Sequence, residues 1–339
     1  MADVFNPMDP KWWPAGARLD FWDITALHEA GRHPAWLADP RTATRRLDHA
    51  RTLKALGLIH SHRTVTTGQL HRLDPTLPAS PAAGLWNDLM ACRLIELGFP
   101  IALNGRTGRS PRTGMFMACR LPIHLDVTQR LAELGFNPFE IASLGPGPLR
   151  GARQYDRHNL ICAELSARFR VAGWRTMGEA WGRFDLLFDD PTAGRGGPDL
   201  ELVRNDGLVV AVEATATVTG IDEKIRRWNR LLAVHPDAGV ACVWLDCSTQ
   251  DNESAVKAAL ARIPGAAGRM RVASARTWLD GRLGVLADGS TLDMLSGPGR
   301  PRVDPSGWMG RETAQLAARF GLDATRWRRP APLAGGCWA

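Results

Sequence analysis

Residues 197–215 read Gly-Pro-Asp-Leu-Glu-Leu-Val-Arg-Asn-Asp-Gly-Leu-Val-Val-Ala-Val-Glu-Ala-Thr. Two hydrophobic runs flank an Asn-Asp-Gly turn, a pattern that is typical of a β-hairpin. Asp199 begins the first strand and Glu213 lies near the end of the second, so antiparallel pairing can bring them together. Carboxylate oxygens are the ligands that Mg²⁺ prefers. The hairpin therefore predicts a site in which Asp199 and Glu213 hold Mg²⁺ or Mn²⁺.

Several charged residues near this hairpin extend the predicted site. Glu213 follows a near-continuous apolar strand, where a carboxylate is costly unless it is paired or bound to a metal. Glu164, on a preceding helix, is either a third metal ligand or an ordinary surface glutamate. Lys224 begins the helix that follows the hairpin and is expected near the bound phosphate. The same helix carries further basic residues that suit a phosphate backbone or form a solvated charged face, namely Arg226, Arg227 and Arg230.

The second half of the chain alternates predicted helices and strands. Residues 155–169 form an amphipathic pattern, and apolar segments follow at 184–188 and 240–245. Helices are expected at 222–232 and 253–261. This alternation predicts an α/β domain with a mixed central sheet flanked by helices.

The first half has the element order of a winged helix-turn-helix. Helices are expected at 42–56, at 66–73 and from residue 80, and they are followed by a hairpin with strands at 93–97 and 115–121. The hairpin loop carries Arg106, Arg109 and Arg112. In such a domain the third helix enters the major groove of DNA and the loop contacts phosphate. The alternative is a small helical domain with a solvated loop.

Composition shifts divide the chain into five predicted segments. An irregular N-terminal segment with a short helix near 19–30 covers residues 1–41, and the winged helix-turn-helix covers 42–143. A Gly-Pro-Gly-Pro stretch marks a linker at 144–153. The α/β domain covers 154–295, and an irregular tail covers 296–339.

Charge and hydropathy restrict the class of protein. The chain has a formal net charge of +7 and a pI near 9.5, which permits binding to a polyanion. No apolar run approaches the roughly 20 residues that a membrane helix needs, and the N-terminus lacks a signal-peptide pattern. The six cysteines are scattered without a Cys-x-x-Cys pair and are expected to be reduced and buried. We therefore expect a cytoplasmic protein without a membrane partner.

Pro198-Asp199, then Glu213-x-Thr215, then Lys224 resembles the PD-(D/E)XK restriction-endonuclease-like fold. Over about residues 42–245 the chain resembles the replication-relaxation family of actinobacterial plasmids and mobile elements. The resemblance implies catalytic roles for Asp199, Glu213, Thr215 and Lys224. One position departs from the nuclease pattern, because Thr215 stands where a lysine is usual. Lys224 has either taken over that role or the nuclease is inactive.

The function expected from these features is metal-dependent cleavage of double-stranded DNA in the replication or transfer of a plasmid or mobile element. The partners would be DNA, a second copy of the chain or other mobile-element proteins. One alternative is a non-catalytic DNA-binding accessory protein with a degenerate nuclease fold. Another is tyrosine transesterification by Tyr155, the only tyrosine in the chain, with His60-Ser61-His62 as a poor match to a metal-binding histidine pair.

Overall fold

The computed structural model describes residues 5–14, 16–23, 35–102, 116–151, 155–248 and 252–295. The described residues divide into two compact units, each with its own β-sheet. The N-terminal unit lies between residues 13 and 160, and the C-terminal unit comprises residues 161–295 together with residues 5–12. The division between the two units falls within one helix, α8 (Asp156–Val171).

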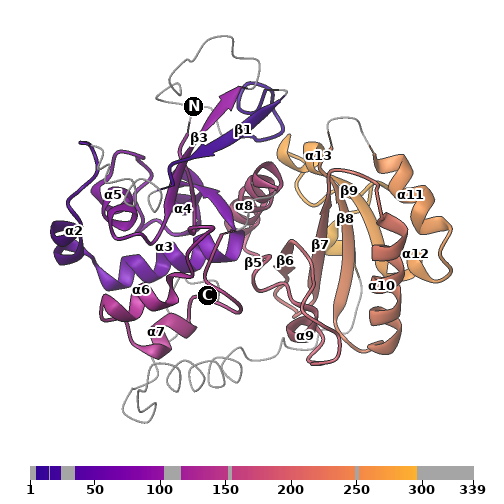
Figure 1. Cartoon of the computed structure of the whole chain (residues 1–339). Coiled ribbons are helices and arrows are strands. Elements are labelled where there is room, and N and C mark those ends of the chain that lie inside the picture. The colour runs from indigo at the N-terminus through magenta and orange to yellow at the C-terminus, as the bar shows by residue number, and fades with distance from the viewer. Residues whose placement is uncertain are drawn as a thin grey trace. The chain divides into compact units, whose positions relative to one another are not determined.

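A five-stranded mixed sheet forms the centre of the C-terminal unit (Figure 1). Its order is β5-β6-β7-β8-β9. The first three strands pair antiparallel, and β8 and β9 run parallel to β7. This confirms the α/β class with a mixed sheet. The elements after α8 are β5 (Arg175–Gly178), α9 (Phe184–Leu187), β6 (Leu200–Val203), β7 (Val209–Thr215), α10 (Ile221–Val234), β8 (Val240–Asp246), α11 (Glu253–Ala261), α12 (Ala266–Arg269), β9 (Met270–Ser274), α13 (Ala275–Leu279) and a 3-10 turn (Leu292–Met294).

The predicted hairpin is confirmed as β6 and β7. Leu200 pairs with Val212 and Val203 pairs with Val209. Between the strands, Gly207 has a φ of 89° and its N–H donates to the carbonyl of Arg204 at 3.0 Å. A positive φ is readily adopted by glycine, which explains why the Asn-Asp-Gly sequence closes the turn.

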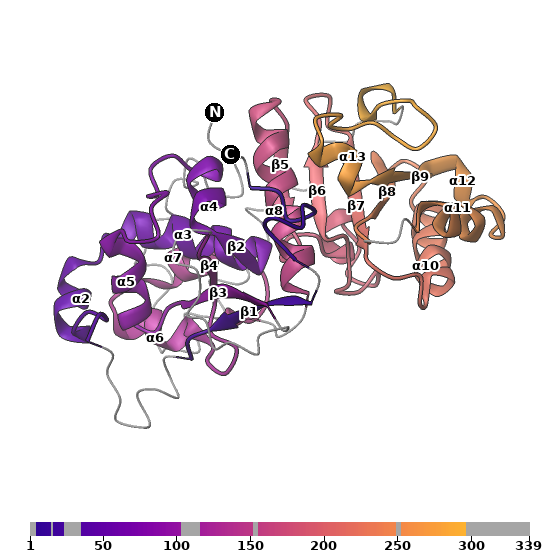
Figure 2. The same cartoon turned by 90° about the horizontal axis from the view of Figure 1, so that it is seen from above.

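Helices cover both faces of this sheet. Helices α10, α11 and α12 gather on one face, as Figures 1 and 2 both show. The other face packs against α8. A hydrophobic cluster there joins residues of α8 to the sheet and includes Ile161, Leu165, Phe169, Val210, Val212, Ala214 and Leu245. Met8 belongs to the same cluster, so the beginning of the chain contributes to the core of the C-terminal unit.

A four-stranded antiparallel sheet and small helices form the N-terminal unit. The strand order is β1-β3-β4-β2. The elements are β1 (Ala17–Phe21), α2 (Pro40–Arg46), α3 (His49–His62), β2 (Thr64–Thr66), α4 (Thr67–Leu73), α5 (Gly84–Ala91), β3 (Glu96–Ala102), β4 (Ala118–Arg120), α6 (Val127–Glu133) and α7 (Pro138–Ala142).

The predicted helix at 66–73 and the predicted hairpin are confirmed in this unit. Thr66 caps α4, because its side chain accepts from the Gln69 N–H while the Gln69 side chain accepts from the Thr66 N–H. This reciprocal pair is a capping box. Strands β3 and β4 pair antiparallel as expected. The hairpin loop with Arg106, Arg109 and Arg112 lies outside the described residues.

Three local predictions for this unit are wrong. The single helix expected at 42–56 is two helices, because Leu47 leaves the helical conformation and Asp48 caps α3 by accepting from the Arg51 N–H. Ser80 does not start the third helix, since α5 begins at Gly84. The helix expected near 19–30 is replaced over its first residues by β1, which pairs with β3. The remainder of that predicted helix, residues 24–34, lies outside the described residues.

The segment predicted as a linker contains buried residues. Within 144–151, Leu144 and Leu149 are buried, and the Pro146 carbonyl lies 3.0 Å from Nε2 of His60 on α3. A domain boundary at 144–153 stays a prediction. The tail at 296–339 lies outside the described residues. Among the helices that the structure does describe, none is long and apolar enough to cross a membrane.

Candidate functional site

Three acidic residues follow one another across neighbouring strands at one end of the five-stranded sheet. On β6, Leu200 is the last residue paired with each neighbouring strand: it pairs with Gly178 of β5 and with Val212 of β7. One position beyond these last pairs come Glu179, Asp199 and Glu213. The two predicted acids, Asp199 and Glu213, are thus brought together. Glu179 was not predicted, because its place in the row depends on a strand, β5, whose pairing the sequence does not reveal.

Asp199 is bonded to the backbone on both sides of Glu213. The Asp199 N–H donates to the Val212 carbonyl at 3.0 Å, and its Oδ2 accepts from the Ala214 N–H at 2.8 Å. Asp199 is half-buried, whereas Glu213 is only 6% exposed. These two hydrogen bonds fix the position of Asp199 relative to the residue that carries the second carboxylate.

Glu213 is held on the face of the sheet that α10 covers. Val212 and Ala214 point into the hydrophobic cluster against α8, so the alternation of side chains directs Glu213 to the opposite face. There the indole Nε1 of Trp228 donates to Oε1 of Glu213 at 2.7 Å. This bond offsets part of the cost of burying a carboxylate.

Two buried thiols, Cys162 and Cys242, are affected by these acids. Burial raises the pKa of the Cys162 thiol well above its ordinary value, and the charges of Asp199, Glu179 and Glu213 add to this rise. Burial likewise raises the pKa of Cys242, with Glu213 contributing. Both thiols are therefore protonated, as expected for buried reduced cysteines.

Thr215 lies at the carboxyl end of β7, beside the end of β8. It pairs with Asp246, and both residues are buried. The Asp246 carboxylate accepts from the N–H groups of Ser248 and Asn252, at 2.9 and 2.8 Å. Asp246 thus holds the loop that follows β8.

Lys224 is exposed near the beginning of α10. It precedes Trp228 by four residues, which places the two side chains on the same side of the helix. Since Trp228 contacts Glu213, α10 lies along the strand that carries this acid. Arg226 and Arg230 are also exposed on α10 and form no ion pair within the described residues.

Arg227 differs from the other basic residues of α10. Its guanidinium lies over the Phe184 ring, 4.5 Å from the centroid, and donates to the Ala193 carbonyl at 3.4 Å. A Cβ on Gly196 would lie 2.8 Å from its Nη1. Arg227, predicted to bind phosphate, is thus engaged in packing the glycine-rich loop 193–197, which leads into Asp199.

Glu164 is paired with a different group. It is fully buried on α8, and its Oε1 accepts from Nε of Arg168 at 2.9 Å. Arg168 also donates to the Leu279 carbonyl at the end of α13. Glu164 therefore has a structural role in joining α8 to α13, and its role as a third metal ligand stays a prediction.

The residues of the transesterification alternative lie in the N-terminal unit. Tyr155 is 71% exposed with a φ of 72°, so it does not pack into a core. His60 and His62 are buried two positions apart on α3, where side chains project to opposite sides. Burial lowers the pKa of His60 to about 3. This arrangement gives no support to a metal-binding histidine pair.

Within the described residues there is no group of three or more His, Cys, Asp or Glu side chains that could hold a metal ion. Asp199 and Glu213 are two carboxylates, and Mg²⁺ is commonly bound by one or two carboxylates together with waters and substrate phosphate. The donor chemistry of this pair therefore fits Mg²⁺ or Mn²⁺. Comparisons of the chain with family models, with curated proteins and with solved structures gave no match.

Proposed function

We propose that the chain is a DNA-binding protein whose C-terminal unit is a metal-dependent phosphodiesterase of the PD-(D/E)XK kind. The order α8-β5-α9-β6-β7-α10-β8 supports this proposal, because three antiparallel strands are followed by a helix and a parallel strand. The resemblance found in the sequence assigns the two acids to Asp199 and Glu213. Asp199 immediately precedes β6 and Glu213 lies within β7, and both are at the same end of the sheet.

The observation that carries the proposal is the pair of hydrogen bonds by which Asp199 brackets Glu213. Two carboxylates held beside each other are electrostatically unfavourable unless a cation or a proton compensates them. Asp199 and Glu213 would hold Mg²⁺ or Mn²⁺, which when bound supplies an activated water and offsets charge on a phosphodiester. Lys224 would contribute a positive charge near the phosphate, and Thr215 would orient a water.

The N-terminal unit is proposed to be a winged helix-turn-helix that binds double-stranded DNA. Its order α3-β2-α4-α5-β3-β4 supports this assignment, as does the adjacency of β2, β4 and β3 in the sheet. The basic net charge of the chain favours a polyanionic partner. Arg106, Arg109 and Arg112 stay predicted phosphate contacts.

The test is cleavage of supercoiled plasmid by the purified full chain with Mg²⁺ or Mn²⁺. Asp199→Asn and Glu213→Gln keep an oxygen acceptor for Ala214 and Trp228 but remove the charge, so cleavage should fall to background. Asp206→Asn is the matched control, since Asp206 is an exposed acid in the turn at the other end of the same hairpin. It should cleave like wild type. Equal cleavage by Glu213→Gln and wild type would contradict the assignment.

A non-catalytic DNA-binding accessory protein is the second candidate. The observation that favours it is Thr215, a neutral residue at the position where the nuclease pattern has lysine. DNA binding by wild type without cleavage in any divalent cation would select this second candidate.

A further inference from the structure

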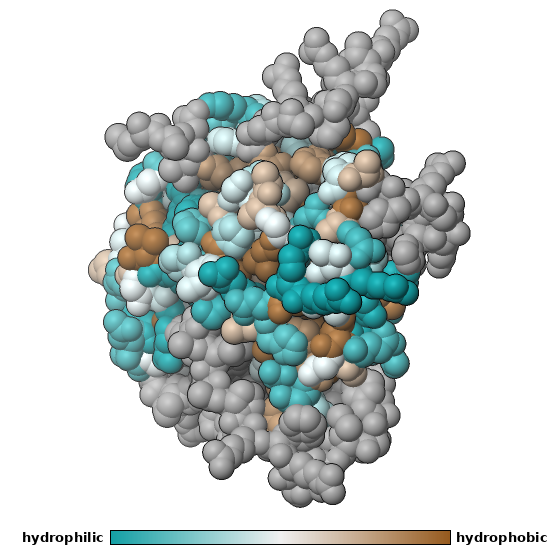
Figure 3. Space-filling model, turned by 90° about the vertical axis from the view of Figure 1, so that its left-hand side faces the viewer, coloured by the Kyte–Doolittle hydropathy of each residue, from teal (hydrophilic) through white to brown (hydrophobic). Residues whose placement is uncertain are grey.

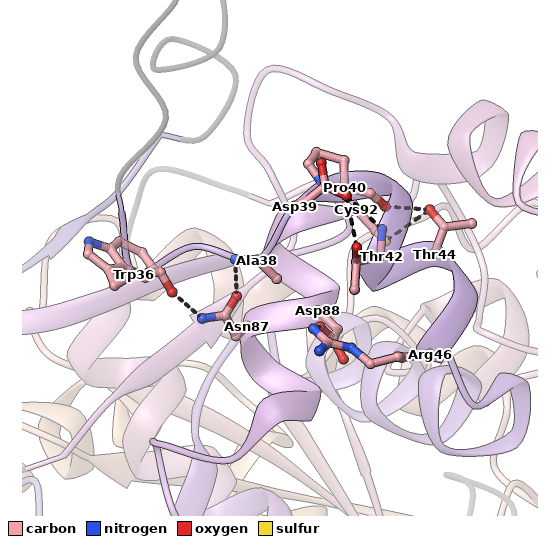
Figure 4. A network of polar contacts seen from close by, with 10 residues as sticks. All are labelled: Trp36, Ala38, Asp39, Pro40, Thr42, Thr44, Arg46, Asn87, Asp88 and Cys92. Atoms are coloured by element: carbon pink, nitrogen blue, oxygen red, sulfur yellow. Dashed lines mark hydrogen bonds and ion pairs between the residues drawn. The ribbon is translucent and has the colours of Figure 1, made fainter.

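Helix α2 is fastened onto α5 by polar contacts at both of its ends (Figure 4). Before α2, the Asn87 amide donates to the Trp36 carbonyl and accepts from the Ala38 N–H, both at 2.7 Å. At the end of α2, Arg46 forms an ion pair with Asp88. The polar side chains of α5 are therefore occupied by the α2 segment.

These contacts make α5 poorly suited to act as a DNA-recognition helix. The helix carries no lysine or arginine, and most of its residues from Trp86 onward are buried. Asp88 would repel phosphate if its ion pair with Arg46 were broken. Helix α5 corresponds to the helix that was predicted to enter the major groove of DNA. Its exposed surface offers few side chains that could bind DNA.

Helix α2 presents two arginines on the side that faces away from α5. Ala43 is fully buried, and residues two positions before and after it point about 160° away on a helix. Those residues are Arg41 and Arg45, and both are exposed. Figure 3 looks onto the left-hand side of Figure 1, and hydrophilic residues on this face are interspersed with neutral and hydrophobic ones.

Five other cations that the structure describes in this unit are paired with acids. Arg46, Arg51, Lys54, Arg120 and Arg130 form ion pairs with Asp88, Asp48, Asp74, Glu96 and Glu133. Arg41 and Arg45 form no ion pair or side-chain hydrogen bond among the described residues. Asp39, the nearby acid, is occupied in capping α2 through the N–H and hydroxyl of Thr42, and these bonds lower its pKa.

We propose that the outward face of α2, formed by Arg41 and Arg45, is a surface by which the N-terminal unit binds the phosphate backbone of duplex DNA. The two residues are four positions apart, so their side chains leave the helix as neighbours. Guanidinium groups suit phosphate oxygens, which accept two parallel N–H donors. The Asn87 and Asp88 contacts hold this face in a fixed orientation. The inference rests on the proposed binding of DNA.

The test measures binding of a fluorescent DNA duplex to the full chain by anisotropy over a range of salt concentrations. Arg41→Ala/Arg45→Ala should weaken binding at low salt by about tenfold or more and reduce the log-log salt slope by about 2, near one unit per lost contact. Arg41→Lys/Arg45→Lys should retain most of the salt slope. The matched control is Arg18→Ala/Arg150→Ala, which removes two other exposed arginines of the same unit. The two double-alanine variants therefore have the same net charge.

The outcomes separate this inference from the proposed function. A loss confined to the Arg41/Arg45 alanine variant supports the α2 surface. Equal effects of the two alanine variants would show that only net charge matters and would overturn the inference while leaving DNA binding intact. Failure of wild type to bind duplex DNA at low salt would overturn the proposed DNA binding itself. Thermal melting of each variant identifies any loss that arises from unfolding.

Discussion

Glu213 is a buried carboxylate within an otherwise apolar strand, β7. A carboxylate within Val-Val-Ala-Val-Glu stands out in the sequence because burial of charge is expensive. The structure supplies a hydrogen-bond donor, the indole of Trp228, which no motif in the sequence indicates. A hydrogen bond from an indole does not neutralise the charge. The cation that we propose at this end of the sheet would lie beside Glu213 and Asp199.

His60 gives a prediction for the pH dependence of stability. Its folded pKa is about 3 because it is buried, whereas an unfolded histidine titrates near 6.5. As pH falls below about 6.5 the unfolded chain binds a proton that the folded chain does not, so stability decreases until about pH 3. Between pH 7 and pH 5 this single group should lower the free energy of unfolding by about 2 kcal/mol.

Urea denaturation at pH 7 and pH 5 measures this effect. His60→Gln should lose about 2 kcal/mol less than wild type between the two pH values. His49→Gln, which alters an exposed histidine at the start of the same helix, should behave like wild type. If His60→Gln shows the full wild-type loss, His60 does not account for it.

At the scale of elements, the loop before β6 determines where Asp199 lies. A Cβ on Gly197 would lie 1.3 Å from the Gly182 carbonyl oxygen, and a Cβ on Gly182 would lie 2.2 Å from the Pro198 oxygen. Two backbone segments therefore approach each other too closely for any side chain. On its other side, the loop is held by Arg227.

We expect Gly197→Ala to displace this loop and with it Asp199. The substitution should destabilise the protein by about 1–3 kcal/mol or more, as overpacking commonly does, and it should reduce divalent-cation binding. Gly268→Ala is the matched control, because nothing lies within 4 Å of the Cβ that it would add. Chemical denaturation of both variants gives the comparison. Equal stability of Gly197→Ala and wild type would contradict the close packing of this loop.

Local sequence rules predicted some elements and missed others for identifiable reasons. The β6–β7 hairpin follows from its turn and its apolar strands, and α4 follows from its threonine cap. The break between α2 and α3 was missed because Asp48 caps a new helix inside a continuous helical pattern. The acidic row was found only in part, since the position of Glu179 depends on the pairing of β5 with β6.

At the level of the whole chain, residues far apart in the sequence share one core. Met8 is only 4% exposed and packs in the core of the C-terminal unit, although more than 150 residues separate it from Ile161 in that core. No periodic pattern in residues 5–12 indicates this contact. The pairing of Glu164 with Arg168 on α8 is likewise not indicated by a sequence motif, and the role of Glu164 as a metal ligand stays a prediction.

We propose that Asp199 and Glu213 together hold a divalent cation. Titration of the full chain with Mn²⁺, followed by water-proton relaxation, tests it without requiring DNA or cleavage. Wild type and Asp206→Asn should bind Mn²⁺ alike, and Asp199→Asn and Glu213→Gln should each weaken binding by at least about tenfold. Absence of Mn²⁺ binding by folded wild type, or equal binding by all four proteins, would contradict the claim.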